Sequence, residues 1–140
     1  MGVIYIADTN IVSELMRPAP NKRLLNQWEQ NHSQTAITAI TWHELLVGVN
    51  RLHSSRKKEA FERFLQAISE TMLIFPYNQA AAKWHAVERA RLIGKGLSPS
   101  FADGQIAGIA STQQKILVTR NVKDFTSYNN LSLLNWFEIE

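Results

Sequence analysis

Four acidic residues are placed where an α/β protein carries out its chemistry, each at the end of a predicted strand or the start of a predicted helix. Asp8 directly follows the first apolar run, and Glu44 and Asp103 each open a predicted helix. Asp124 follows a later apolar run after a short turn, and the chain has only three aspartates in all. Four carboxylates gathered at one place repel one another, and a hard divalent cation with oxygen ligands relieves that repulsion.

A site of this kind has a defined chemistry. Mg²⁺ or Mn²⁺ held by carboxylates polarises a phosphodiester and lowers the pKa of an attacking water. One ion or two could serve, and a two-metal site would hold its ions about 3.5–4 Å apart. The acids therefore predict a metal-dependent nuclease, with Asp8, Glu44, Asp103 and Asp124 as both metal ligands and catalytic residues.

The same acids have a second interpretation as helix caps. Thr41 with Glu44, Ser100 with Asp103, and Asn121 with Asp124 all have the spacing of a capping box. Acids in a first helical turn also complement the helix dipole. Asp8 has the same alternative, as the N-cap of a following helix. An acid can border a cap and still bind a metal, so the case for chemistry depends on the four together.

Apolar periodicity predicts the elements that position these acids. Strands are expected near residues 3–7, 35–38, 72–75, 116–118 and 131–134, and helices near residues 24–28, 45–52, 60–68, 79–93 and 101–113. Short strands alternating with helices predict a three-layer α/β/α sandwich with a short, central, mostly parallel sheet. Ligands of such sheets bind beyond the carboxyl ends of the strands, which is where Asp8 and Asp124 follow theirs.

Composition limits the class of protein without choosing the function. The chain has 140 residues, 45% hydrophobic and 19% charged, which predicts a single folded domain over residues 1–140. It has no cysteine, no signal-peptide pattern and no apolar stretch near 20 residues, so we expect a cytoplasmic protein without a membrane segment. The net charge of +3 is compatible with a polyanionic partner but does not require one.

Four motifs in order resemble those of PIN-domain nucleases. They are Ile4-Tyr5-Ile6-Ala7-Asp8-Thr9-Asn10, Glu44-Leu45-Leu46-Val47-Gly48, Asp103-Gly104-Gln105-Ile106-Ala107-Gly108-Ile109-Ala110 and Thr119-Arg120-Asn121-Val122-Lys123-Asp124-Phe125. Together they span nearly the whole chain. A compact chain with these motifs is similar to the VapC-type toxins of that family, near the FitB-like branch.

The resemblance implies roles for individual residues. Asp8, Glu44 and Asp103 match the core acidic triad, and Asp124 matches the more variable fourth acid. Thr119 matches a hydroxyl position beside the metal, and Asn10 and Asn121 match polar positions at its edge. The resemblance also implies a PIN-like fold, a magnesium site, ribonuclease activity as the toxin of a type II toxin–antitoxin system, a homodimer, and a cognate antitoxin whose tail reaches the active-site groove.

Two further features concern substrate contact and helix packing. Arg120 and Lys123 bracket Asn121, so we expect them to contact RNA phosphates, although solvated surface charge is the common role of such residues. Gly104 and Gly108 each lower the stability of a helix by about 1 kcal/mol relative to alanine. Close packing of that helix against a neighbour would explain them.

Two other functions compete with the nuclease. In the first, the protein is a non-catalytic module that binds nucleic acid or a partner protein, and the acids serve only as caps. In the second, it is a phosphatase of the haloacid dehalogenase type, but that chemistry needs an aspartate two residues after Asp8, and position 10 is asparagine. The zinc protease motif HExxH also fails, because Val47 stands where it requires histidine.

Overall fold

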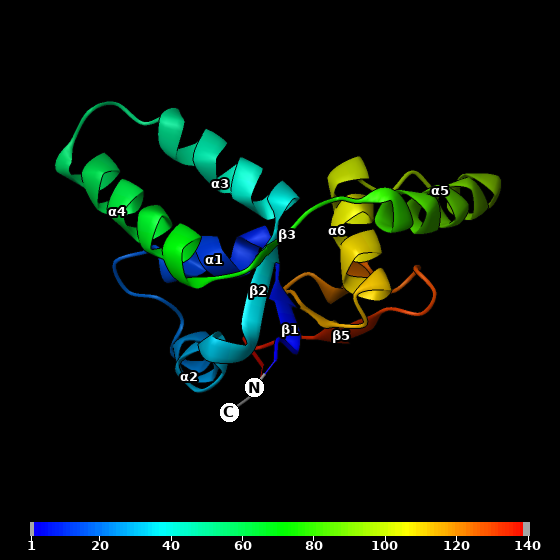
Figure 1. Cartoon of the computed structure of the whole chain (residues 1–140), viewed down its shortest axis with the longest axis horizontal. Coiled ribbons are helices and arrows are strands. Elements are labelled where there is room, and N and C mark those ends of the chain that lie inside the picture. The colour runs from blue at the N-terminus through cyan, green and yellow to red at the C-terminus, as the bar shows by residue number, and fades with distance from the viewer. Residues whose placement is uncertain (1, 139–140) are drawn as a thin grey trace.

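Five short parallel strands form the centre of the computed structural model, which describes residues 2–138 (Figure 1). The strands are β1 (Tyr5–Ala7), β2 (Thr35–Thr38), β3 (Ile74–Phe75), β4 (Ile116–Val118) and β5 (Ser132–Leu134). Their spatial order is β3-β2-β1-β4-β5, and every neighbouring pair is parallel. Along the chain, β2 and β3 are added on one side of β1, and β4 and β5 are then added on its other side. This makes the carboxyl ends of β1 and β4 the switch point where such sheets bind ligands.

Within the described residues 2–138, six α-helices connect the strands, and each begins after a polar residue that caps it. The helices are α1 (Thr9–Leu15), α2 (Lys22–Asn31), α3 (Ala39–Asn50), α4 (Arg56–Thr71), α5 (Gln79–Gly94) and α6 (Phe101–Thr112). Short 3₁₀ turns lie at η1 (His32–Gln34) and η2 (Val122–Asp124). The capping residues are Asp8, Asn21, Thr38, Ser55, Asn78 and Ser100, and each side chain accepts a hydrogen bond from the amide three residues later. These bonds satisfy amides that a helix leaves unpaired at its start.

Alternation along the strands divides the interior into two cores, one on each face of the sheet. Ala7 and Val118 face the core shared with helices α1 to α4, whereas Ile6 and Leu117 face the core built with α5 and α6. Successive strand side chains point to opposite faces, so both faces must be covered to bury them. In Figure 1 the α3–α4 pair and the α5–α6 pair stand on opposite sides of the strands. The predicted three-layer α/β/α fold with a parallel sheet is confirmed.

The two glycines of α6 lie where that helix packs closely against α5. A Cβ on Gly104 would overlap the ring of His85, and a Cβ on Gly108 would lie 2.8 Å from the carbonyl oxygen of Ala81. Both neighbours belong to α5. The sequence prediction that close packing explains these glycines is therefore confirmed, and the neighbouring helix is identified as α5.

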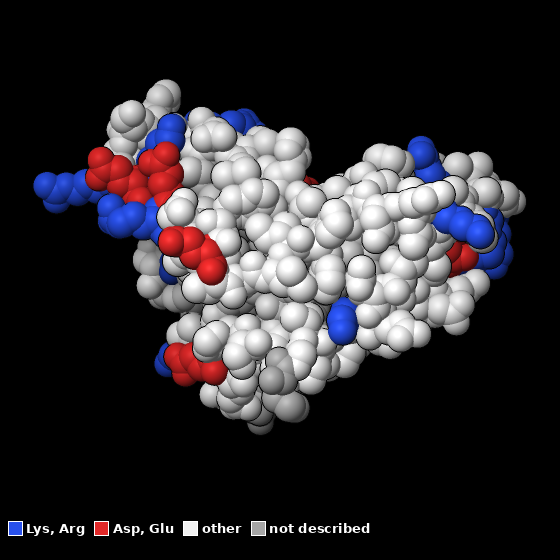
Figure 2. Space-filling model, viewed as in Figure 1, with Lys and Arg blue, Asp and Glu red and all other residues white. Residues whose placement is uncertain are grey.

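Charged side chains gather toward the two ends of the molecule in the view of Figure 2, over the start of α4 and over α5. The middle of that face is mostly uncharged. Among residues 2–138, no helix is both long enough and apolar enough to cross a membrane.

Candidate active site

Asp8 and Thr119 lie side by side at the carboxyl edge of the sheet, because they follow the adjacent strands β1 and β4. Ala7 pairs with Val118, and the Asp8 amide donates to the Val118 carbonyl at 3.0 Å. The buried Thr119 hydroxyl accepts the amide of Asn121 at 3.0 Å and donates to the Asp8 carboxylate. Burial raises the pKa of Asp8, and the hydrogen bond from Thr119 partly opposes that rise.

Glu44 reaches the same edge from the middle of α3. Its Oε1 accepts a hydrogen bond from the Thr9 hydroxyl at 2.6 Å, and that hydroxyl also lies 3.1 Å from the hydroxyl of Thr41. Thr9 is the first residue of α1, directly after Asp8. The contact therefore ties the first acidic motif to the second, across 35 positions of sequence. Thr9 is a site residue that the sequence prediction missed, although it belongs to the first motif.

The pKa of Asp103 is raised in part by the charges of the other three predicted acids. Its pKa rises from 3.8 to about 6, first because the carboxyl is desolvated and then because of the charges of Asp124, Asp8 and Glu44. Asp103 is in the first turn of α6, where the Ser100 hydroxyl accepts its amide at 3.2 Å. The carboxyl of Asp103 therefore lies within electrostatic range of the other three predicted acids.

The helix-cap interpretation proves correct for some of these acids and wrong for others. Asp8 caps α1 by accepting the Ile11 amide at 3.1 Å, and Ser100 caps α6. The predicted box of Thr41 with Glu44 is wrong, because α3 begins at Ala39 and Thr38 caps it, which places both residues inside the helix. Asn121 makes no side-chain cap for η2. Capping therefore leaves Glu44 and Asp124 unexplained.

The remaining predicted residues divide between a hollow and the open surface. Asn10, Arg120 and Asn121 line one hollow beside the acids. Lys123 is exposed on η2 and is not among the residues that line it. A second hollow is lined by Asp103 and Asp124 together with three serines.

Partly buried polar contacts hold the loop that directly follows Asp124, the last residue of η2. The Glu88 carboxylate on α5 accepts two hydrogen bonds from Arg91, at 2.8 and 3.0 Å, and one from the Asn129 amide at 2.6 Å. Arg91 also donates to the Ser127 carbonyl at 2.7 Å. These contacts hold both sides of the loop after η2 against α5. The hydrogen bonds from Arg91 lower the pKa of Glu88, which keeps that carboxylate ionised.

The donor chemistry around Asp103 fits a hard cation. Carboxylate and hydroxyl oxygens are the ligands that Mg²⁺ and Mn²⁺ prefer. Within residues 2–138, no three His, Asp or Glu side chains are already arranged to hold a metal ion. Of the four histidines, His32, His43 and His53 are exposed, and His85 is buried between α5 and α6.

A PIN-domain profile matches residues 5–130 of the chain. The chain belongs to the PIN-domain family, as its four motifs predicted. Toxin FitB of Neisseria gonorrhoeae is 32% identical over 127 residues, which cover 87% of this chain and 91% of that protein. Ribonuclease VapC2 of Rickettsia felis is 30% identical over 135 residues, covering 96% and 98%.

The fold agrees with a solved complex as well. A chain of the structure of FitAB bound to an IR36 DNA fragment matches this chain with a TM-score of 0.89 at 28% identity, over 98% of each chain. The predicted resemblance to VapC-type and FitB-like toxins is confirmed by these relatives.

Proposed function

We propose that this protein is a divalent-cation-dependent endoribonuclease that acts as the toxin of a type II toxin–antitoxin pair. The geometry that carries the proposal is the carboxyl edge of the sheet, where Asp8 follows β1 beside Thr119 and the Thr9 hydroxyl donates to Glu44 at 2.6 Å. The charges of Asp124, Asp8 and Glu44 raise the pKa of the partly buried Asp103, and a bound cation would offset these charges. Relatives named as toxin and ribonuclease support the activity.

Asp8, Glu44, Asp103 and Asp124 would hold Mg²⁺ or Mn²⁺ in this proposal. The bound cation would lower the pKa of an attacking water and offset the negative charge that develops on the phosphate. Glu44 and Asp124 have exposed side chains that can change rotamer toward a cation, which supports assembly of the site on binding. Thr119 positions the Asp8 carboxylate through its hydroxyl, and Thr9 does the same for Glu44.

Substrate contacts are proposed from the residues beside the acids. Asn10 and Asn121 offer neutral hydrogen-bonding groups at the edge of the site, and Arg120 and Lys123 offer positive charge to the phosphates of RNA. Hydrolysis would join the water oxygen to phosphorus and break one P–O ester bond, whose oxygen leaves with a proton. The chain's part is to bind the strand and to orient the phosphate toward the acids.

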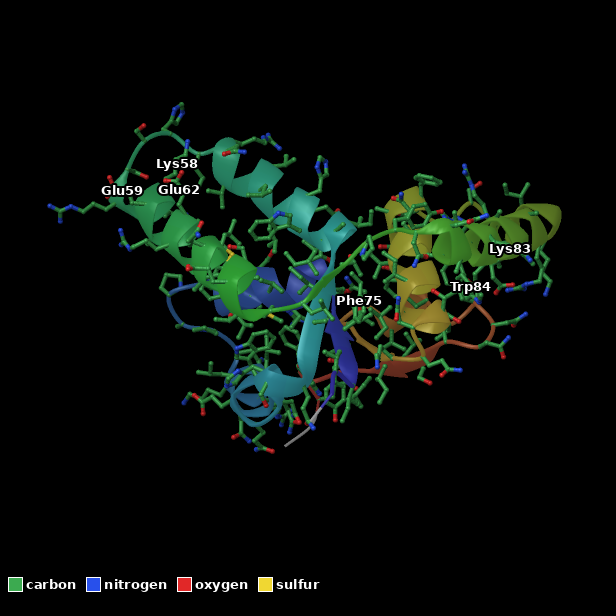
Figure 3. All side chains as sticks on the ribbon, in the orientation of Figure 1. Lys58, Glu59, Glu62, Phe75, Lys83 and Trp84 are labelled. Carbon is green, nitrogen blue, oxygen red and sulfur yellow. The ribbon has the colours of Figure 1, made fainter. Side chains whose placement is uncertain are left out.

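Cleavage assays on RNA with Mg²⁺, Mn²⁺ and chelator test this proposal. Asp8→Asn and Asp103→Asn should each abolish cleavage, because each removes an ionised oxygen ligand at the centre of the cluster. Glu62→Gln is the matched control, since Glu62 is an exposed acid on α4, well away from β1 in Figure 3. Cleavage by Asp8→Asn and Asp103→Asn at the parent rate, or cleavage of equal rate in chelator, would refute the proposal.

A cognate antitoxin and a homodimer complete the proposal. An apolar groove of about 360 Å³ beside Glu44, between α1, α3 and α4, supports binding of an antitoxin segment next to the acids. Its apolar residues include Met16, Leu45, Val49 and Phe61.

Growth arrest on expression should be relieved by the neighbouring gene and by Asp8→Asn. Light scattering of the purified chain would show twice the mass of one chain.

The alternative is a non-catalytic module that binds nucleic acid or a protein partner. The absence of a ready-made metal group among residues 2–138 favours it, and so does the DNA named in the FitAB structure. It predicts that Asp8→Asn changes stability while the toxicity of the chain remains. A folded Asp8→Asn variant that has lost toxicity would exclude it.

A further inference from the structure

Two arginines from distant parts of the chain meet at the hollow that flanks the acids. The hollow has a volume of about 580 Å³. Arg17, just after α1, and Arg120, just after β4, both line it, together with Glu14 and Phe137. The two arginines are 103 positions apart in sequence, so the fold alone brings them together.

The hollow begins where the acidic site ends. Asn10 lines it and stands two residues after Asp8. Asn121 also lines it, and its amide donates to the Thr119 hydroxyl that supports Asp8. Asn10 and Asn121 therefore connect the acidic site to this hollow, so a nucleic-acid strand bound at the acids can continue into it.

Each arginine is positioned by a neighbour while donors of its guanidinium remain available. The Arg120 guanidinium lies 4.4 Å from the centre of the Phe137 ring, and among the described residues it donates no hydrogen bond. Arg17 donates through Nη1 to Glu14 at 3.3 Å. Glu14 also accepts the Asn21 amide at 2.9 Å, so it is held in place. A stacked or paired guanidinium loses less conformational freedom when it binds an anion.

Charge distinguishes this hollow from the second one. Arg17 and Arg120 outnumber the single acid Glu14, so their hollow carries net positive charge. The second hollow is lined by Asp103 and Asp124 with uncharged residues, so its charge is negative. The net positive charge of the arginine hollow attracts a polyanion.

We propose that the hollow of Arg17 and Arg120 binds the RNA backbone phosphate next to the one that is cleaved. The proposal rests on the proposed ribonuclease function, because it assumes that RNA is the strand that crosses the acids. The two guanidinium groups donate to the phosphate oxygens, and Asn10 and Asn121 line the path from the acids to this phosphate. Arg17 is a substrate-binding residue that none of the sequence motifs contains.

Binding of RNA in the Asp8→Asn background tests the proposal without depending on cleavage. Fluorescence anisotropy with a single-stranded RNA should show affinity lowered roughly tenfold by Arg17→Ala and by Arg120→Ala. Arg120→Lys should be intermediate, since it keeps the charge but loses the planar fork. Lys83→Ala is the control, because Lys83 is an exposed cation on α5, at the end of the molecule opposite α4 in Figure 3. It should bind RNA as its Asp8→Asn parent does.

A set of RNAs with one uncharged methylphosphonate linkage each locates the phosphate. A methylphosphonate at one particular linkage should weaken RNA binding by the Asp8→Asn protein. The same methylphosphonate should not change RNA binding once Arg17 and Arg120 are both alanine. Loss of one phosphate contact should also reduce the salt slope of log K by about 0.7. In the otherwise unmodified chain, the arginine variants should raise KM for RNA and leave kcat and the Mg²⁺ requirement unchanged.

The outcomes separate this proposal from the proposed function. Arginine variants that bind RNA as tightly as the Asp8→Asn parent overturn the phosphate site, whether or not the protein cleaves RNA. Variants that keep RNA affinity but lose the antitoxin overturn it in favour of a protein partner. If RNA binding depends on the arginines but no cleavage occurs with any cation, the phosphate site stands and the ribonuclease function fails.

Discussion

Replacing Gly104 with alanine places a methyl group where the ring of His85 already lies. The new Cβ would be 2.6 Å from Cδ2 and 2.8 Å from Cε1 of that ring, and it would overlap Nε2. Carbon atoms in ordinary contact are about 3.5–4.0 Å apart, so one helix or the ring must move by about 1 Å. The His85 ring cannot move freely. Its Nδ1 lies 3.0 Å from the Tyr77 hydroxyl, and the centres of the His85 and Phe101 rings are 5.1 Å apart.

The expected change in stability is the difference between two effects. Forcing extra volume into a packed site destabilises by about 3 kcal/mol at the upper end of the usual range. Alanine is favoured over glycine within a helix by about 1 kcal/mol. Gly104→Ala should therefore lower the free energy of unfolding by about 2 kcal/mol, which is a fall in Tm of about 7 °C for a domain of this size.

Urea and thermal unfolding, compared at one protein concentration, measure this effect. Gly48→Ala is the matched control, since Gly48 is inside α3 and an added Cβ meets nothing within 4 Å. It should raise stability by about 1 kcal/mol. In a His85→Ala background the clash is gone, so Gly104→Ala should then stabilise as well. Gly104→Ala that stabilises the parent chain, or destabilises equally without the His85 ring, would refute the packing argument.

Three further predictions concern ionisation and buried hydrogen bonds. The pKa of Asp103, about 6 against 3.8 in the unfolded chain, makes the metal-free protein lose stability as pH rises from about 4 to 6. Asp103→Asn should therefore stabilise it at pH 7 by about 1–2 kcal/mol, a value discounted for partial exposure, with no gain at pH 4. Thermal unfolding measured across pH tests this, and an equal gain in stability at pH 4 and pH 7 would contradict the pKa argument. Glu88→Ala should lower stability by about 2 kcal/mol in urea, because the Asn129 amide and Arg91 lose a buried charged acceptor. An unchanged midpoint would mean that the loop is held by other contacts. Thr119→Val should reduce stability by about 1–3 kcal/mol and RNA cleavage roughly tenfold, with Thr119→Ser near the parent in both, since the buried hydroxyl serves Asp8 and Asn121. Equal activity of the valine and serine variants would contradict that role.

Local patterns in the sequence were sufficient for most of the architecture. The strand at residues 116–118 was predicted with its observed bounds, and α4, α5 and α6 were placed within four residues at each end. The helix predicted near residues 45–52 begins six residues earlier, at Ala39. Periodicity works here because each strand or helix buries one or two defined faces. The start of α3 was misplaced for a physical reason. Thr38 and Thr41 are both good caps, and only the position where β2 stops pairing decides that Thr38 is the cap.

The candidate site could be predicted only as far as its acids. Asp8, Glu44, Asp103 and Asp124 follow from their motifs, and Asp8 also from the rule for the carboxyl ends of strands. The hydrogen bond from Thr9 to Glu44 could not be predicted, because it depends on how α1 and α3 pack. The same limit applies to Arg17, which no motif contains.

The sequence by itself determined the order of the strands and of the longer helices, the four acids and the two glycines that need a close neighbour, whereas the short helix α1 was not among the predicted helices. Those features depend on residue type and spacing, which the chain carries locally. The tertiary structure decided which helix fills the space beside Gly104, and that the acids share one charge environment around Asp103. It also decided that Arg17 and Arg120 line the same hollow. Contacts between distant residues depend on the packing of whole elements against both faces of the sheet, and no local pattern records that packing.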